Sequence, residues 1–120
     1  MIEYNGIAYS FRNYNCYDHV VRVRKDNGIK TKLFKPRNID TAFSVISAEM
    51  QKLDHGLTKA DTPENYDIVF VSKTISGRKV HHCGIYFDGL VSHCDRTAKQ
   101  VRMEQLADFS ATYEAPTFWR

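Results

Sequence analysis

The dipeptide Asp88-Gly89 limits the possible folds of this chain more than any other short segment. It lies between two apolar runs, and an Asp-Gly pair in that position is a strong signal for a tight β-hairpin. Both residues accept the left-handed backbone that such a turn requires. The pair therefore predicts a strand over residues 79–87 that reverses direction and returns as a strand over residues 90–94.

The neighbouring segments extend this hairpin into a larger sheet. Residues 67–71 are mostly β-branched and aromatic, which favours a strand, and the turn signal Ser76-Gly77 separates them from the hairpin. A short helix is expected over residues 103–109 and a final strand over residues 112–119, with its proline near an edge. The second half of the chain is therefore expected to form a mostly antiparallel sheet.

The first half of the chain has a helical pattern instead. A helix is expected to begin near Asn15, with Asn13 or Asn15 as its N-cap, and to end at Asn27-Gly28. A second helix is predicted over residues 39–53, where apolar residues recur at spacings of three and four. Helices before a mostly antiparallel sheet indicate an α+β fold, and 120 residues suit a single domain over residues 1–120.

The composition restricts the classes of partner. The net charge is +3, from 17 Lys and Arg against 14 Asp and Glu, a mild bias that fits an anionic partner such as a cell-wall polymer. The excess is small and the aromatic and basic motifs of known nucleic-acid modules are missing, so we expect no nucleic-acid partner. No secretory signal and no apolar run of membrane-spanning length are visible, so we expect synthesis in the cytoplasm and no membrane span.

The three cysteines are Cys16, Cys83 and Cys94. An odd number without a secretory signal argues against a disulfide framework, so at least one thiol is expected to be free. Cys16 begins the predicted helix, where the helix dipole and free backbone N–H groups lower the pKa of a thiol and can hold an oxyanion. Cys16 is therefore the candidate nucleophile. The alternative is a small buried apolar residue, because Cys16 shares a helix face with Val20 and Val23.

Two histidines lie on the two arms of the predicted hairpin, His82 on the first and His93 on the second. Side chains alternate between the faces of a sheet, so both imidazoles can lie on one face of adjacent strands. One could then take the proton of Cys16, and the other could orient the first. The alternative is a pair of structural histidines. His19 is expected to point away from the Cys16 face of the helix.

A zinc site is the competing interpretation, because His81-His82-Cys83 and His93-Cys94 are rich in metal-ligand types. Strand alternation argues against it, since the two cysteines would face away from His82 and His93. No compact pair has the usual ligand spacing, so we expect no metal and no cofactor. Cys83 and Cys94 are expected to be core residues, as cross-strand neighbours.

Five segments form a set that is recognisable in this order: Gly6-Ile7-Ala8-Tyr9, Asn15-Cys16-Tyr17-Asp18-His19-Val20-Val21, Asp67-Ile68-Val69-Phe70, His82-Cys83-Gly84-Ile85-Tyr86 and Val91-Ser92-His93. In the same order they resemble the G-x-P-Y segment, the D-C-S-G-L-V helix, the G-D-L-V-F strand, the H-V-G-I-Y strand and the following strand of the NlpC-type cell-wall peptidases. That last strand ends in the third polar residue of the family's site. The resemblance covers nearly the whole chain.

This resemblance implies a papain-like fold and hydrolysis of an amide bond in the stem peptide of peptidoglycan. Cys16 would attack the carbonyl, His82 would act as general base and then as acid for the leaving amine, and His93 would orient His82. Tyr9 and the backbone N–H of Cys16 would support the oxyanion. The chain is most similar to the tail-associated members of long-tailed bacteriophages, which implies other phage tail proteins as partners. Its place would be the phage tail or the bacterial cell wall.

The sequence departs from the family pattern beside the nucleophile. Asn15 replaces the usual Asp, and Tyr17-Asp18 replaces Ser-Gly. The hairpin between His82 and His93 is slightly shorter than usual, which leaves the register of His93 open. Two alternatives to the peptidase therefore remain, because a fold does not fix a substrate. They are a structural or assembly component of a phage tail that needs no catalysis, and a related thiol amidase or acyltransferase on another substrate.

Overall fold

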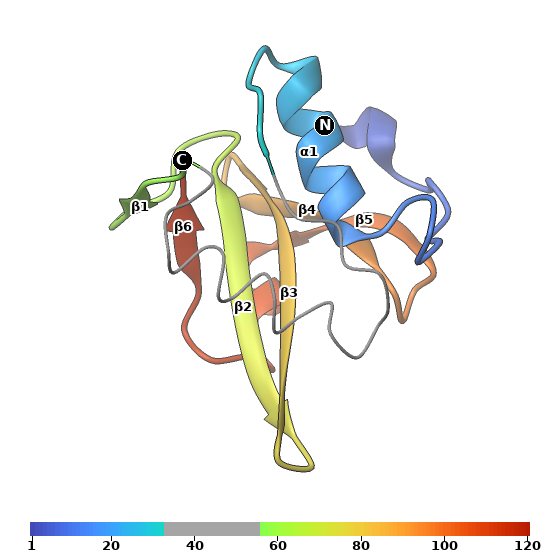
Figure 1. Ribbon diagram of the computed structural model, residues 1–120, viewed down its shortest axis with the longest axis vertical. Helices are drawn as coiled ribbons and strands as arrows, with labels where there is room; N and C mark the ends of the chain where they lie inside the picture. The colour runs from blue at the N-terminus through green and yellow to red at the C-terminus, as the bar shows by residue number, and fades with distance from the viewer. Residues whose placement is uncertain (33–55) are drawn as a thin grey trace.

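The computed structural model describes residues 1–32 and 56–120, which form an α+β fold (Figure 1). In the described residues, a six-stranded antiparallel sheet with few helices confirms the predicted α+β class and the mostly antiparallel sheet. The helix predicted over residues 39–53 lies outside the described residues. In chain order the elements are η1 (Ile2–Tyr4), α1 (Cys16–Asp26), β1 (Lys59–Ala60), β2 (Ile68–Ile75), β3 (Arg78–Phe87), β4 (Leu90–Asp95), β5 (Gln100–Gln105), α3 (Leu106–Ser110) and β6 (Thr117–Trp119).

The strands lie in the order β1-β6-β2-β3-β4-β5, and each neighbouring pair is antiparallel. Both predicted turns are confirmed, since φ is 51° at Ser76 and 76° at Gly77, and 48° at Asp88 and 84° at Gly89. Two consecutive positive φ values give the turn that matches the twist of a hairpin. β2 and β3 form one long hairpin that projects from the sheet, and β4 returns beside the end of β3 (Figure 1).

Helix α1 begins at Cys16 because Asn15 caps it, as predicted. The Asn15 side-chain oxygen accepts from the backbone N–H groups of Tyr17 (3.0 Å) and Asp18 (3.2 Å). The Asp18 carboxylate accepts in return from the Asn15 N–H at 3.0 Å, which completes a capping box. Gly28, with φ of 77°, follows the helix end and permits the left-handed backbone there. These caps fix the position of the candidate nucleophile.

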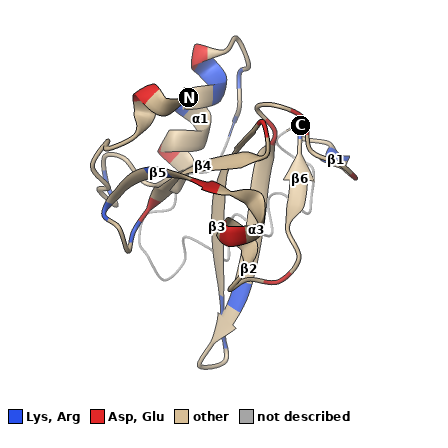
Figure 2. Ribbon diagram, turned by 180° about the vertical axis from the view of Figure 1, so that it is seen from behind, with Lys and Arg blue, Asp and Glu red and all other residues tan. Residues whose placement is uncertain are grey.

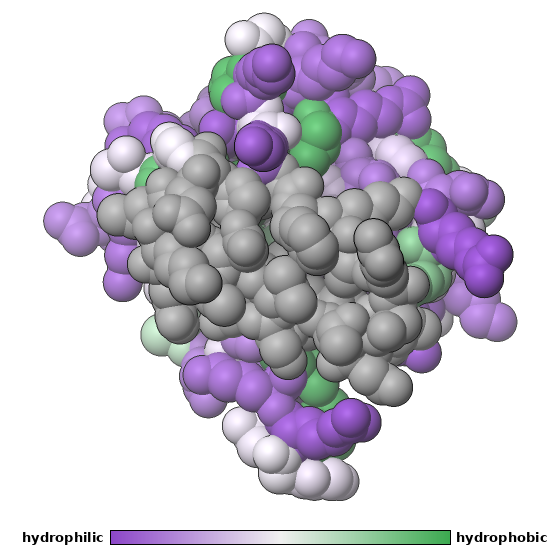
Figure 3. Space-filling model, in the orientation of Figure 1, coloured by the Kyte–Doolittle hydropathy of each residue, from purple (hydrophilic) through white to green (hydrophobic). Residues whose placement is uncertain are grey.

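The sheet carries a core on each face. One core lies between the sheet and α1, and the other between the sheet and α3, which Figure 2 shows on the opposite side. The first core contains Val20 and Val23 of α1, so the apolar face of the predicted helix is buried as expected. On the face drawn in Figure 3, the hydrophobic side chains of the described residues show as small separate patches among hydrophilic ones.

The last third of the chain differs from the prediction. The helix expected over residues 103–109 is wrong in its first part, because Gln100–Gln105 form β5 and pair with β4; only Leu106–Ser110 are helical. The edge of β4 offers a full ladder of hydrogen bonds to this segment, which outweighs its weak helical pattern. The last strand is shorter than predicted, Thr117–Trp119, and the two-residue β1 that pairs with it was not predicted.

Candidate active site

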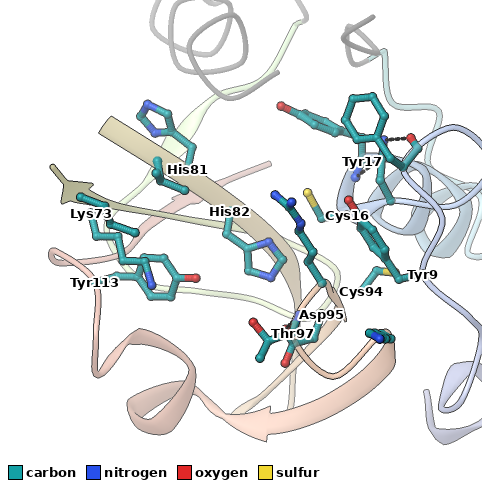
Figure 4. A pocket seen from close by; sticks show the side chains of 16 residues that line it. Tyr9, Cys16, Tyr17, Lys73, His81, His82, Cys94, Asp95, Thr97 and Tyr113 are labelled. Atoms are coloured by element: carbon teal, nitrogen blue, oxygen red, sulfur yellow. Dashed lines mark hydrogen bonds between the residues drawn. The ribbon is translucent and has the colours of Figure 1, made fainter. Parts of the chain in front are cut away.

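A cavity of about 520 Å³ opens where the start of α1 meets β3 and the loop after β4 (Figure 4). Cys16, His82 and Tyr9, three of the four predicted site residues, line it. The fourth, His93, lies behind His82 and is buried. The remaining lining residues are Phe11, Asn15, Tyr17, Lys73, Ile75, Val80, His81, Cys94, Asp95, Arg96, Thr97, Lys99 and Tyr113.

Cys16 is the first residue of α1, and the residue is 5% exposed at the wall of the cavity. Its neighbours hold its pKa below the ordinary value of a thiol. The largest cause is the hydrogen bond from the Cys83 thiol, and the His82 imidazole acts in the same direction, while burial opposes both. The Asn15 cap accepts from the Tyr17 and Asp18 amides, so the Cys16 N–H takes no part in it. That amide is available to hold an oxyanion beside the sulfur.

The pKa values of the other two thiols are raised instead of lowered. The pKa of Cys83 is raised, because its hydrogen bond to Cys16 and its burial both favour the protonated form. Burial raises the pKa of Cys94 to about 12, and its sulfur donates to the backbone oxygen of Tyr14 at 3.4 Å. Both belong to the core between α1 and the sheet, as predicted. The β3–β4 ladder ends at the pair Ile85–Ser92, and the same register continued beyond it would place Cys83 opposite Cys94.

His82 and His93 contact each other directly. Nε2 of His82 lies 2.9 Å from Nδ1 of His93, and the two rings meet edge to face with centroids 5.0 Å apart. Since His93 engages Nε2 of His82, Nδ1 is the nitrogen that remains for Cys16. The half-buried His82 therefore stands between the cavity and the buried His93. This contact answers the question of register that the short hairpin raised.

Gly84 is what allows the two histidine strands to approach so closely. A Cβ atom at this position would lie 2.6 Å from Cγ1 of Val91, 2.9 Å from the Ser92 oxygen and 3.1 Å from Cβ of His93. The β3–β4 ladder also stops here, at the pair Ile85–Ser92. β3 therefore diverges from β4 beyond Gly84, and His82 is free to turn toward the start of α1.

Glu104 is a member of the site that the sequence reasoning missed. Its Oε2 atom lies 2.7 Å from Nε2 of His93, and its Oε1 atom contacts Nη2 of Arg102. Burial lowers the pKa of His93, with the nearby His82 acting the same way and Glu104 opposing them. The missed signal was the strand alternation of residues 100–105, which would have placed Glu104 on β5 beside β4.

His19 does not point away from the Cys16 face, so that expectation is wrong. It is fully buried between α1 and the sheet, where Nδ1 lies 2.8 Å from the Tyr14 hydroxyl and Nε2 lies 2.8 Å from Oγ of Ser92. Burial lowers the pKa of His19 to about 3, and the charges of His93 and Arg22 add to this. His19 stays neutral and holds two hydroxyl groups together, away from the cavity.

Tyr9 and three cations complete the cavity wall. Tyr9 is half-buried on the side of Cys16, as Figure 4 shows, and burial raises its pKa, so the phenol keeps its proton. Of the charged residues in the described part of the chain, Lys73, Arg96, Lys99 and the acidic Asp95 line the cavity. The cation Lys73 also lies over the ring of Tyr113, 4.7 Å from its centroid. The cavity therefore carries a cationic excess.

The geometry supplies a thiol of lowered pKa, an adjacent imidazole and a second imidazole behind it. Such a set can perform nucleophilic acyl transfer. Within residues 1–32 and 56–120, no three His, Cys, Asp or Glu side chains are grouped to hold a metal ion, and no helix is long and apolar enough to cross a membrane. No model of a known protein family matches the chain, and no curated protein shows significant similarity to it.

Proposed function

We propose that this chain is a papain-like cysteine endopeptidase that hydrolyses an amide bond in the stem peptide of peptidoglycan. The observation that carries the proposal is the convergence of Cys16, at the capped start of α1, with the hydrogen-bonded pair His82–His93 at one cavity. Papain-like sites place a thiol at a helix N-terminus against an imidazole on a packed sheet. The resemblance of the five sequence segments to the NlpC-type peptidases supports the same reading.

The reaction follows from the positions of these groups. The Cys16 thiolate attacks the carbonyl carbon, and the oxyanion is held by the Cys16 N–H and the Tyr9 hydroxyl. Protonated His82 gives its proton to the leaving amine as the C–N bond breaks, which leaves a thioester on Cys16. Neutral His82 then takes a proton from water, and the resulting hydroxide cleaves the thioester to a carboxylate. His93 keeps the His82 ring in place throughout.

The charge of the cavity supports an anionic acyl substrate. Within residues 1–32 and 56–120, three cationic residues, Lys73, Arg96 and Lys99, and one carboxylate, Asp95, line the cavity. Stem peptides of peptidoglycan carry several carboxylates, and cationic side chains around a cleft raise the local concentration of such a ligand. Increasing salt should therefore raise the KM for muropeptides, whereas it should leave kcat nearly unchanged.

We place the protein in the tail of a long-tailed bacteriophage, made in the host cytoplasm and acting at the cell wall with other tail proteins. This part rests on the resemblance to the tail-associated members of the peptidase family. Mass spectrometry of purified virions tests it. Detection of this chain in the tail fraction would support the placement, and its presence in infected cells but not in virions would contradict it.

Digestion of purified muropeptides tests the activity. The wild-type chain should release a new amine and a new carboxylate, detected by mass spectrometry, and Cys16→Ala should release neither. Cys94→Ala is the matched control, because Cys94 lines the same cavity with a raised pKa and should keep activity. A Cys16→Ala variant that still cleaves would refute the mechanism. A wild-type chain that reacts at Cys16 yet cleaves no muropeptide would favour the thiol amidase on another substrate.

A further inference from the structure

The hydrogen-bonded series that starts at the cavity continues past His93 to a carboxylate. His82 Nε2 contacts His93 Nδ1 at 2.9 Å, and His93 Nε2 contacts Glu104 Oε2 at 2.7 Å. The series connects β3, β4 and β5, three consecutive neighbours in the sheet. Each ring uses one nitrogen toward the cavity and the other away from it, so the proton positions along the series depend on one another.

Two arrangements of protons fit these distances, because a neutral imidazole has one donor nitrogen and one acceptor nitrogen. In the first, His93 holds its proton on Nε2, and its Nδ1 accepts from Nε2 of His82. Nδ1 of His82 then carries no hydrogen, and its lone pair can take the proton of Cys16. In the second, His93 holds its proton on Nδ1 and donates to His82, whose Nδ1 then carries a hydrogen and cannot act as a base.

The carboxylate of Glu104 distinguishes the two arrangements. An ionised carboxylate accepts hydrogen bonds and cannot donate one, so it requires the proton of His93 to be on Nε2. A contact between the other oxygen of Glu104 and Arg102 keeps the carboxylate in position. Nε of Arg102 also lies 3.8 Å from Oδ2 of Asp95. The His93 side chain is 4% exposed and that of Glu104 is 21% exposed, so water competes little for this contact.

We propose that Glu104 is a positioning residue that fixes the proton of His93 on Nε2 and thereby makes Nδ1 of His82 the proton acceptor for Cys16. The inference deepens the proposed function and rests on its thiol–imidazole chemistry. The role of Glu104 does not depend on which substrate is cleaved. The same arrangement serves the protonated His82, which still needs an acceptor at Nδ1 of His93. Glu104 touches no substrate, and it acts through His93.

Glu104→Gln is the direct test, because an amide can donate as well as accept and no longer selects one arrangement. The rate of Cys16 alkylation should fall about tenfold near pH 6, and the acid limb of its pH profile should move up by about one unit. Alkylation at about pH 9, where an ordinary thiol ionises unaided, should change little. Glu104→Asp should restore part of the loss. Glu114→Gln, a carboxylate at the surface beside Lys79 and Ser72, is the control and should behave as wild type.

Nitrogen NMR of the imidazoles gives a readout that a purely structural role would not move. In the wild-type chain, His93 should carry its proton on Nε2, and in Glu104→Gln both nitrogens should share it. A wild-type His93 protonated on Nδ1 would overturn the proposal even if the variant failed to fold, and so would an unchanged pH profile in a folded Glu104→Gln. The charged and titratable groups that act on this series are Cys16 and His19 of α1, Asp95 of β4, Arg102 of β5 and Tyr113 after α3.

These measurements need no peptidoglycan, which separates the two proposals. If the wild-type chain cleaves no muropeptide but the profile shifts in Glu104→Gln, the substrate assignment fails and the role of Glu104 stands. If muropeptides are cleaved and neither the profile nor the His93 proton responds to the substitution, the role of Glu104 fails and the proposed function stands.

Discussion

Strand β4 presents two buried polar clusters on its opposite faces, and they differ in what their histidine contacts. On the α1 face, Ser92 meets His19, whose other nitrogen meets the Tyr14 hydroxyl. On the α3 face, the next residue, His93, meets His82 and the carboxylate of Glu104. Both histidines are buried and both have lowered pKa values.

The contrast shows that burial alone does not make a histidine functional. His19 contacts two hydroxyl groups, each of which can donate or accept, so neither contact requires its proton on one particular nitrogen. The series through His93 has a carboxylate at one end and a thiol at the other, which gives it a direction. The cluster around His19 should therefore serve stability, and the cluster around His93 should serve chemistry.

The largest expected effect is on activity, and it tests the difference between the two histidine clusters. His82→Ala should lower kcat by a factor of about 100 or more, because a general base contributes 10²–10⁴-fold. His19→Ala should keep kcat within a few-fold of wild type wherever it is folded. Muropeptide hydrolysis measures both variants, with circular dichroism to establish folding. Equal losses in the two variants would remove the distinction between the faces.

The second effect concerns stability and has the opposite order. His19→Ala should cost about 2–4 kcal/mol, because it leaves a cavity and removes the partner of the buried Ser92 hydroxyl and of the half-buried Tyr14 hydroxyl. His82→Ala removes a half-buried side chain at the cavity and should cost less than about 1.5 kcal/mol. Urea unfolding measures both free energies. A His82→Ala variant that loses more stability than His19→Ala would contradict the assignment of roles.

The third effect, that of Gly84→Ala, combines a loss of stability with slower Cys16 alkylation. Gly84→Ala should cost about 1–3 kcal/mol, since its Cβ would collide with β4 beside Ser92 and His93. It should also slow Cys16 alkylation, because the His82–His93 contact depends on the same close approach. Gly77→Ala, in open space at a hairpin tip with φ of 76°, is the control. It should cost about 1 kcal/mol and leave alkylation unchanged.

The smallest effect is the dependence of stability on pH. The pKa of His19 is about 3 in the folded chain and near 6.5 when unfolded, so below about pH 6.5 the unfolded state binds one more proton. Its contribution to stability is complete above that pH and is lost as the pH falls toward 3. His19→Gln should reduce the fall in unfolding free energy between about pH 6 and pH 5 by about 1 kcal/mol. Parallel urea-unfolding curves for the variant and wild type would contradict this.

The sequence predicted the first part of the site better than the last. Asn15, Cys16 and the turn at Asp88-Gly89 carry local signals, since caps and tight turns depend on residues close in sequence. The direct contact of His82 with His93 depends instead on Gly84 and the end of the β3–β4 ladder, which no local pattern reveals.

The predictions for Glu104 and His19 failed for different reasons. Residues 103–109 have a weak helical pattern, and the free edge of β4 decides that the first of them are strand. With β5 unrecognised, Glu104 had no place beside His93. The expectation for His19 misapplied the helical phase, because a residue three positions after Cys16 lies on the same side of the helix. His19 is buried there beside Ser92 of β4.

The most direct test of the central claim is the pH dependence of alkylation in the folded wild-type chain, with each cysteine followed separately by mass spectrometry. If Cys16 and His82 form a thiol–imidazole pair, Cys16 should react rapidly well below the ordinary thiol pKa of about 8.5, and Cys83 and Cys94 should not. That selectivity should disappear in His82→Ala. A Cys16 as inert as Cys83 and Cys94 across the same range would contradict the account and favour a structural role in the phage tail.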